Sequence, residues 1–175
     1  MPQFNNVMII TEDQVGEGSP LLFPSVSSCS AVVACLANTL VGAHFTQDVW
    51  TGVDPQKFTR RLLDGLKDKI GVRPIDRLLI VGFNQGHNPP KIMSDLEVPP
   101  AHCDTYDISR KGVPDVTLIF THQGAGVRPK VDFKRQTKVT AAADPNPDWT
   151  MADLRKGALG TATTGKLHTL RKHFV

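Results

Sequence analysis

The sequence predicts a domain of the α/β (α+β) class. Two apolar runs, 30–36 and 40–45, have the length of strands and are joined by a turn through Asn38. A helical pattern over 54–70 is followed closely by another strand-like apolar run over 77–83. Strand, helix and strand therefore alternate, and a chain of 175 residues is long enough to bury one proper core.

The helix over 54–70 carries the clearest signals of any element. Asp54 is a good N-cap, Pro55 fits the first helical position, and Gly71 is a natural C-terminal stop. Hydrophobic residues recur at helical spacing between charged ones, at Phe58, Leu62, Leu63, Leu66 and Ile70. One face of this helix is therefore expected to lie against the rest of the domain.

Shorter patterns complete the expected order of elements. They predict a first strand over 6–11, a loop over 16–20, a short helix over 90–96, strands over 103–108 and 115–121, and an edge strand over 131–140. Pro24 restricts Phe23 to an extended conformation. The glycine-bearing turn at 123–126 favours a hairpin between the last two strands.

Positive charge gathers at the C-terminal end of the chain. The net charge is +3, and from Lys134 onward eight Lys and Arg residues face only three Asp and Glu. We therefore expect a catalytic α/β domain over 1–140 and a basic tail over 141–175, either packed on the domain or partly disordered. The tail could meet an acidic partner, a membrane surface or nucleic acid, or be a solvated basic end. An aromatic content of 6% argues against a surface that stacks nucleobases, so no nucleic-acid partner is expected.

The cysteines and the N-terminus bear on compartment and metal content. Cys29, Cys35 and Cys103 are an odd count without the dense spacing of a disulfide framework, and the six histidines show no zinc-ligand spacing. The sequence shows no secretory signal, and no apolar run approaches the roughly 20 residues of a membrane span. The expectation is a protein made in the cytoplasm, with no membrane span. Export or delivery to a host cell without a cleavable signal is left open.

The most informative stretch surrounds Cys29, which follows a hydroxyl-rich turn and precedes an apolar run. His44 comes fifteen positions later, on the next expected strand, so the hairpin could place the sulfur against the imidazole ring. A thiol needs such a partner because the thiolate is the nucleophile. Cys29 is thus a candidate nucleophile and His44 a candidate base. The alternative is a buried cysteine beside a core histidine.

Two further roles are expected around this pair. The turn before Cys29 can aim the main-chain amides of Ser28 and Cys29 at a developing oxyanion while leaving the sulfur exposed. A third group should orient the ring, and the sequence offers Ser25, Ser27, Thr46, Gln47 or a main-chain carbonyl. Ser25 is taken as the third member among these.

Other polar residues and thiols compete less strongly for a role. Cys35 lies inside an apolar run and is expected in the core, while Cys103 is a spare thiol. His87, Asn88 and His122 lie in loops that follow strands, where α/β proteins often place function, although ordinary solvated loops have the same pattern. No phosphate-binding context surrounds the glycines of the 123–126 turn.

The order of these features resembles the chemoreceptor glutamine deamidases (CheD), and the same Cys–His framework occurs in the cytotoxic necrotizing factor toxins and related lethal-factor deamidases. The resemblance rests on the Ser28-Cys29 turn with its apolar strand, on Gly42-Ala43-His44 in the next strand, on the helix that follows, and more faintly on the glycine-rich turn and strand over 124–133. Two positions depart from the pattern. Ser27 replaces the glycine of the Gly-Ser-Cys turn, and Phe23 replaces a threonine six residues before the cysteine.

This resemblance implies a layered domain with a central mixed, largely antiparallel β-sheet or sandwich flanked by helices, needing no metal or cofactor. It implies a cysteine amidohydrolase that converts a glutamine side chain of a target protein to glutamate and releases ammonia. Such an enzyme would suit a signalling regulator or a toxin that acts as an effector in virulence. Two alternatives stay open: a non-catalytic binding or adaptor domain on the same fold, and a nucleic-acid-binding protein that uses the basic tail.

Overall fold

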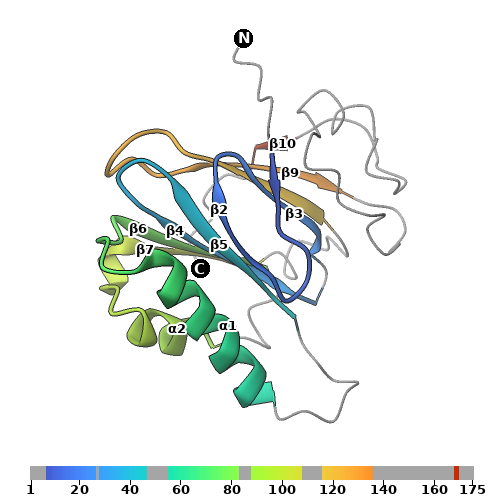
Figure 1. Ribbon diagram of the computed structural model, residues 1–175. Helices are drawn as coiled ribbons and strands as arrows, with labels where there is room; N and C mark the ends of the chain where they lie inside the picture. The colour runs from blue at the N-terminus through green and yellow to red at the C-terminus, as the bar shows by residue number, and fades with distance from the viewer. Residues whose placement is uncertain are drawn as a thin grey trace.

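The computed structural model describes residues 7–26, 28–46, 55–82, 88–107, 116–135 and 168–169, with backbone alone at Ser25, 55–59, 107, 134–135 and 168–169. Two β-sheets lie face to face, and two helices cover the outer side of one of them (Figure 1). The predicted α+β class and its layered arrangement are confirmed. No helix in these ranges is long and apolar enough to cross a membrane.

The first sheet has the strand order β1-β3-β8-β9-β10. Its strands are β1 (Met8–Ile9), β3 (Leu21–Val26), β8 (Val116–Thr121), β9 (Lys130–Arg135) and β10 (His168–Thr169). Only β1 and β3 run parallel, while the other neighbours are antiparallel. The predicted hairpin is the β8–β9 pair, in which Phe120 faces Val131.

The second sheet has the strand order β2-β5-β4-β6-β7. Its strands are β2 (Val15–Gly18), β4 (Ser30–Cys35), β5 (Leu40–Phe45), β6 (Arg77–Gly82) and β7 (Cys103–Asp107). Neighbours are antiparallel except for β6 and β7, whose parallel pairing needs the crossover through α2 (Pro89–Asp95) and a 3₁₀ turn (Pro100–His102). The sheets are therefore mixed and largely antiparallel, as expected.

Strand β4 shows why the apolar run at 30–36 does not alternate with polar residues. Ala31, Val33 and Cys35 contribute to the core between the sheets, whereas Val32 and Ala34 contribute to the core under the helices. All six residues of β4 and all six of β5 are buried. The second sheet lies between the first sheet and the helices, so β4 is covered on both faces. A strand in this position needs apolar residues throughout, which explains why its sequence does not alternate.

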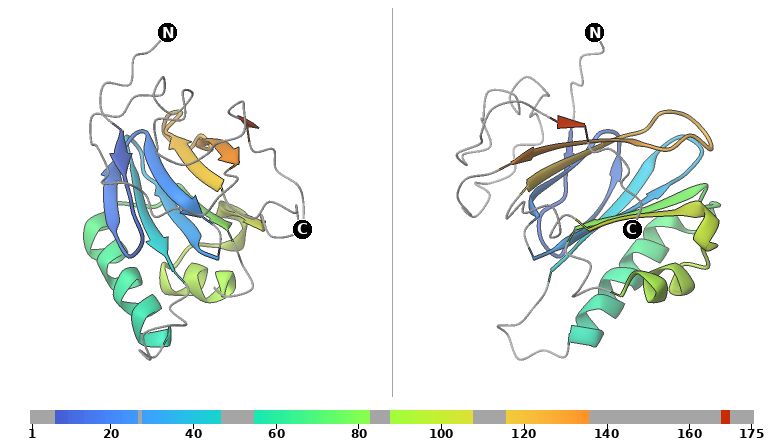
Figure 2. Two further views of the ribbon diagram at one scale, coloured as in Figure 1. Left: turned by 90° about the vertical axis from the view of Figure 1, so that its right-hand side faces the viewer. Right: turned by 180° about the vertical axis from the view of Figure 1, so that it is seen from behind.

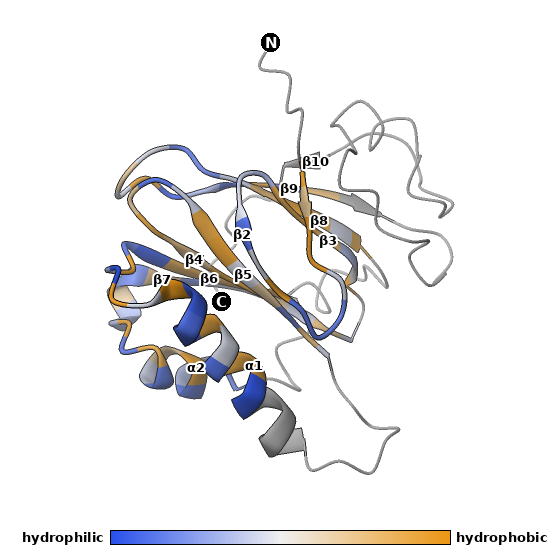
Figure 3. Cartoon of the chain, in the orientation of Figure 1, coloured by the Kyte–Doolittle hydropathy of each residue, from blue (hydrophilic) through white to orange (hydrophobic). Residues whose placement is uncertain are grey.

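The helices form the outer layer on the second sheet. Helix α1 (Pro55–Ile70) packs along β5 and β2 through Leu62, Leu63, Leu66 and Ile70. Figure 2 shows both helices on the same side of the sandwich, and Figure 3 shows hydrophobic residues along the strands and on the sheet-facing side of α1. Gly71 ends α1 with a φ of 64°, a left-handed conformation that a glycine adopts without strain.

Two sequence expectations are corrected at the sheet edges. The expected loop over 16–20 contains most of strand β2, because glycines at 16 and 18 let this strand run close to the Met8 and Ile10 side chains. The expected edge strand, observed as β9, is not the last strand, since His168 pairs with Phe133 through β10. The predicted boundary at residue 140 and nearly all of the tail lie outside the described residues.

Gly42 in β5 lies where side chains of the facing sheet come very close to the main chain of this strand. A Cβ there would lie 2.7 Å from Phe23 Cζ and 2.9 Å from Leu21 Cδ1, and both of these side chains are fully buried. We expect Gly42→Ala to lower the free energy of unfolding by about 1–3 kcal/mol, the cost of overpacking a filled core. Urea unfolding measures this change.

Gly65 in α1 is the matched control, because a Cβ there meets only Val15 Cγ2 at 3.4 Å. Gly65→Ala should leave stability unchanged or raise it by up to about 1 kcal/mol through better helix propensity. Equal effects of the two substitutions would contradict the close sheet contact at Gly42.

Candidate functional site

Cys29 directly precedes β4, where the chain enters the middle of the second sheet. Ser30 pairs with Gly82 of β6 on one side and with Phe45 of β5 on the other. A Cβ on Gly82 would lie 2.3 Å from the Cys29 carbonyl oxygen, so only glycine allows β6 to run this close. The main chain at Cys29 is thereby held from both sides.

His44 lies in β5, and the strand register sets its relation to Cys29. His44 pairs with Ala31, two residues after Cys29, so the two side chains project from the same face of neighbouring strands. Diagonal neighbours of this kind stand about 7–8 Å apart, within reach of an aromatic side chain. The hairpin through Asn38 therefore brings the predicted pair onto one face, which is the face between the two sheets.

The exposure predicted for the sulfur is wrong. Cys29 is only 3% exposed and His44 is fully buried. The reason is the direction of the side chain: Cys29 belongs to the core between the sheets rather than to the surface turn. Ser28, directly before it, is exposed.

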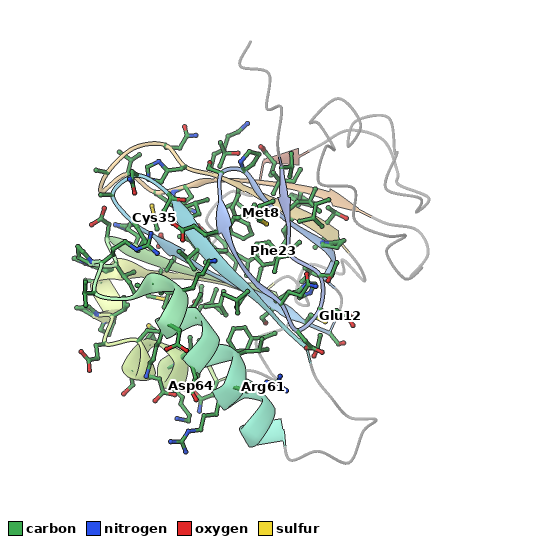
Figure 4. The ribbon with its side chains drawn as sticks, in the orientation of Figure 1. Met8, Glu12, Phe23, Cys35, Arg61 and Asp64 are labelled. Atoms are coloured by element: carbon green, nitrogen blue, oxygen red, sulfur yellow. The ribbon has the colours of Figure 1, made fainter. Side chains whose placement is uncertain are left out.

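Two contacts fix the imidazole ring of His44. Nδ1 lies 3.1 Å from the main-chain oxygen of Ile10, just after β1. The ring of Phe23 stands edge-on to it, with centroids 5.8 Å apart and planes inclined by 71°. Figure 4 shows Phe23 between the two sheets. Because a carbonyl only accepts, the neutral ring carries its proton on Nδ1, and Nε2 keeps the lone pair that a base requires.

The Ile10 carbonyl thus orients the ring, one of the alternatives that the sequence left open. Ser25 lies in β3 with its side chain outside the described residues, and Ser27 and Gln47 lie outside them altogether. The hydroxyl of Thr46 donates instead to Asp13 Oδ1, at 2.5 Å. Phe23, which stands where the resembling family has a threonine, still faces the histidine.

Glu12 is the group near the thiol that sequence reasoning missed. Its Oε1 lies 3.8 Å from Cys29 Sγ, although the two residues are 17 positions apart in the chain. Glu12 belongs to the turn between β1 and β2, which is bound to β5 through Asp13 N–H donating to the His44 carbonyl. An exposed acidic residue in a turn has no sequence signal that points to a distant thiol.

No family model and no curated protein matches this chain. A thiol, an imidazole with a defined tautomer and an orienting carbonyl are the parts of a nucleophile–base pair. The Glu12 carboxylate lies beside the thiol of this pair. Within the described ranges, no group of three or more His, Cys, Asp or Glu side chains could hold a metal ion.

The other loop candidates have structural contacts. Asn88 caps α2 by accepting from Lys91 N–H at 3.2 Å, and His87 lies outside the described residues. The His122 ring lies 2.9 Å from the Leu36 carbonyl and accepts from Gly124 N–H at 3.2 Å, so it fastens the β8–β9 loop to the far end of β4. Neither Asn88 nor His122 is brought to Cys29.

Cys35 is a core thiol, as predicted, and lies at the opposite end of the strands from Glu12 (Figure 4). Burial, and then the nearby Asp76 carboxylate, raise the pKa of Cys35 to about 11 from its ordinary value of 9.0. Cys103 is half-buried and packs against the core under the helices. Its side chain therefore projects from the face of the sheet opposite to that of Cys29.

The raised pKa of Cys35 predicts a loss of stability at high pH. The folded chain favours the neutral thiol, so this contribution is complete below pH 9.0 and is lost as pH rises toward about 11. We expect the free energy of unfolding of the wild type to fall more steeply over this range than that of Cys35→Ala. Urea unfolding below pH 9 and near pH 11 measures both slopes, and equal slopes would contradict the prediction.

Proposed function

We propose that the protein is a cysteine-dependent amidohydrolase that converts a glutamine side chain of a target protein to glutamate. The observation that carries this proposal is the placement of His44. It projects from the same inner face as Cys29, with its Nδ1 proton directed at the Ile10 carbonyl. That hydrogen bond leaves Nε2 as the atom that can accept a proton from a thiol.

The proposed reaction proceeds in two stages. His44 Nε2 takes the thiol proton, and the Cys29 sulfur attacks the carboxamide carbon to give a tetrahedral oxyanion, with main-chain N–H groups at Ser28 and Cys29 as the proposed donors. The imidazolium then protonates the leaving nitrogen, so the C–N bond breaks and ammonia departs. Water, deprotonated by the same ring, attacks the thioester, and the thiolate leaves with glutamate as the product.

The partner in this proposal is a protein that presents a reactive glutamine, and no cofactor is required. Deamidation replaces a neutral donor with a negative charge, which suits either a signalling regulator or an effector delivered to another cell. The basic tail over 141–175 would help to dock an acidic target.

A second candidate function has two observations in its favour. Cys29 is 3% exposed and touches the Glu12 carboxylate, and both burial and a nearby negative charge disfavour a thiolate. These features suit a binding or adaptor domain that has the same fold but in which Cys29 does not act as a nucleophile. An ordinary, slow thiol alkylation at Cys29 would favour this reading.

The proposal is tested by incubating the protein with glutamine-bearing target proteins and measuring ammonia release together with the Gln-to-Glu mass change in the target. The wild type should release ammonia, and Cys29→Ala should not. Absence of both signals across acidic candidate targets, together with ordinary Cys29 alkylation, would reject the enzyme in favour of the binding domain.

A further inference from the structure

The carboxylate of Glu12 stands where a substrate must arrive. The Cys29 thiol donates a long hydrogen bond to its Oε1, with 3.8 Å between Sγ and that oxygen. Glu12 itself is exposed, whereas Cys29 is buried. The Glu12 side chain therefore lies between the buried sulfur and the solvent. A group that reaches the sulfur from this side must pass within contact distance of that carboxylate.

The main chain around Glu12 is held in place by the same elements that hold His44. Asp13 N–H donates to the His44 carbonyl at 3.0 Å, and His44 N–H donates to the Gln14 carbonyl at 3.1 Å. Asp13 also accepts from the Thr46 hydroxyl. Hydrogen bonds at Asp13 and Gln14 thus hold the turn against β5. The main chain next to Glu12 is therefore fixed relative to the strand that carries His44.

We propose that Glu12 is a specificity-determining residue that makes the site accept a neutral carboxamide and reject a carboxylate. This inference rests on the proposed function and deepens it. The –NH₂ of a carboxamide can donate a hydrogen bond to the Glu12 carboxylate, as charge-assisted hydrogen bonds favour. A carboxylate offers only acceptors and a like charge, which is repelled at this distance. Glutamine is drawn in, and glutamate is expelled once it has formed.

Two small alkylating reagents test this discrimination directly. Iodoacetamide carries the carboxamide of the substrate, and iodoacetate carries the carboxylate of the product. Each forms an S–C bond at Cys29 as the C–I bond breaks and iodide leaves. Mass spectrometry of the Cys29 peptide gives both rate constants. Because both reagents react with the same thiolate, their ratio does not depend on the pKa of the thiol.

Because Glu12 is exposed to water, we expect the amide-to-acid rate ratio at wild-type Cys29 to exceed that of free cysteine by at least about fivefold, the factor that repulsion between two like charges about 4 Å apart in water produces. Glu12→Gln should bring the ratio down to that of free cysteine. Asp13→Asn is the matched control and should keep the wild-type ratio. It removes the same charge one residue away, keeps an acceptor for Thr46, and suits the φ of 65° at that position.

An unchanged ratio in Glu12→Gln while ammonia release continues would overturn the role of Glu12 and leave the proposed function standing. A ratio that falls in Glu12→Gln, in a protein that releases no ammonia, would support the selectivity and count against deamidation. Failure of both reagents to modify wild-type Cys29 would overturn the inference, since it requires that small molecules reach the sulfur past Glu12.

Discussion

Replacing Cys29 with alanine is expected to abolish ammonia release from a glutamine-bearing target. The sulfur is the proposed attacking atom, and alanine offers no nucleophile in its place. Cys29→Ser should also lose at least about a thousandfold in rate, because a hydroxyl keeps its proton far more tightly than a thiol does. Both variants preserve the size of the side chain closely enough for the β4–β5 pairing to survive, and circular dichroism with thermal unfolding checks this.

Cys35→Ala is the matched control for this prediction. It removes a thiol on the same inner face, at the far end of the strand that follows Cys29. Its activity should equal that of the wild type, allowing for some loss of stability from the buried cavity. Full activity of Cys29→Ser, or equal losses in the Cys29 and Cys35 variants, would contradict a nucleophile at position 29.

That Cys29 and His44 share one face of the sheet could be predicted because side-chain direction in a β-hairpin follows a simple rule. Side chains alternate with a period of two, so a turn through Asn38 fixes which residues of 30–36 and 40–45 share a face. Both runs are strongly apolar, and their register is held by burial on both sides. Helix α1 was equally predictable, from local capping and spacing that depend on no distant residue.

The Ile10 carbonyl and Glu12 both lie just after β1, and the sequence could not reveal their place beside His44 and Cys29. The orienting atom is the main-chain carbonyl of Ile10, and a carbonyl is present in every residue. Glu12 reaches the thiol only because β1 and β2 belong to different sheets that meet at this point. The glycines of β2 have the composition of a loop, so the strand that continues from this turn was also missed.

Packing and hydrogen bonding around the His44 ring are divided between Phe23 and Ile10. A threonine at position 23 would be polar, whereas Phe23 is fully buried against His44 and Phe120. Its ring provides only packing and an edge-to-face contact, so it can hold the imidazole but cannot accept the Nδ1 proton. The Ile10 carbonyl accepts the hydrogen bond from Nδ1 instead, so the group that orients the ring is a main-chain atom.

The second large effect is expected at His44, where the role of base and the role in packing can be separated. His44→Ala leaves the buried Ile10 carbonyl without its donor, which costs about 1–3 kcal/mol of stability. His44→Gln avoids this loss because its amide can donate to the same oxygen, yet an amide cannot act as a base. We expect His44→Gln to fold like the wild type and to lose about 10²- to 10⁴-fold in deamidation rate.

The pH dependence of Cys29 alkylation by iodoacetamide distinguishes a base from a packing residue. In the wild type, an imidazolium beside the sulfur would stabilise the thiolate, so the alkylation rate should persist below the ordinary thiol pKa of 9.0. In His44→Gln that low-pH reactivity should disappear, while a stability equal to the wild type would show that packing is intact. Identical alkylation profiles in the two proteins would mean that His44 does not act on the Cys29 thiol. The hydrogen bond to Ile10 would then serve only to stabilise the fold.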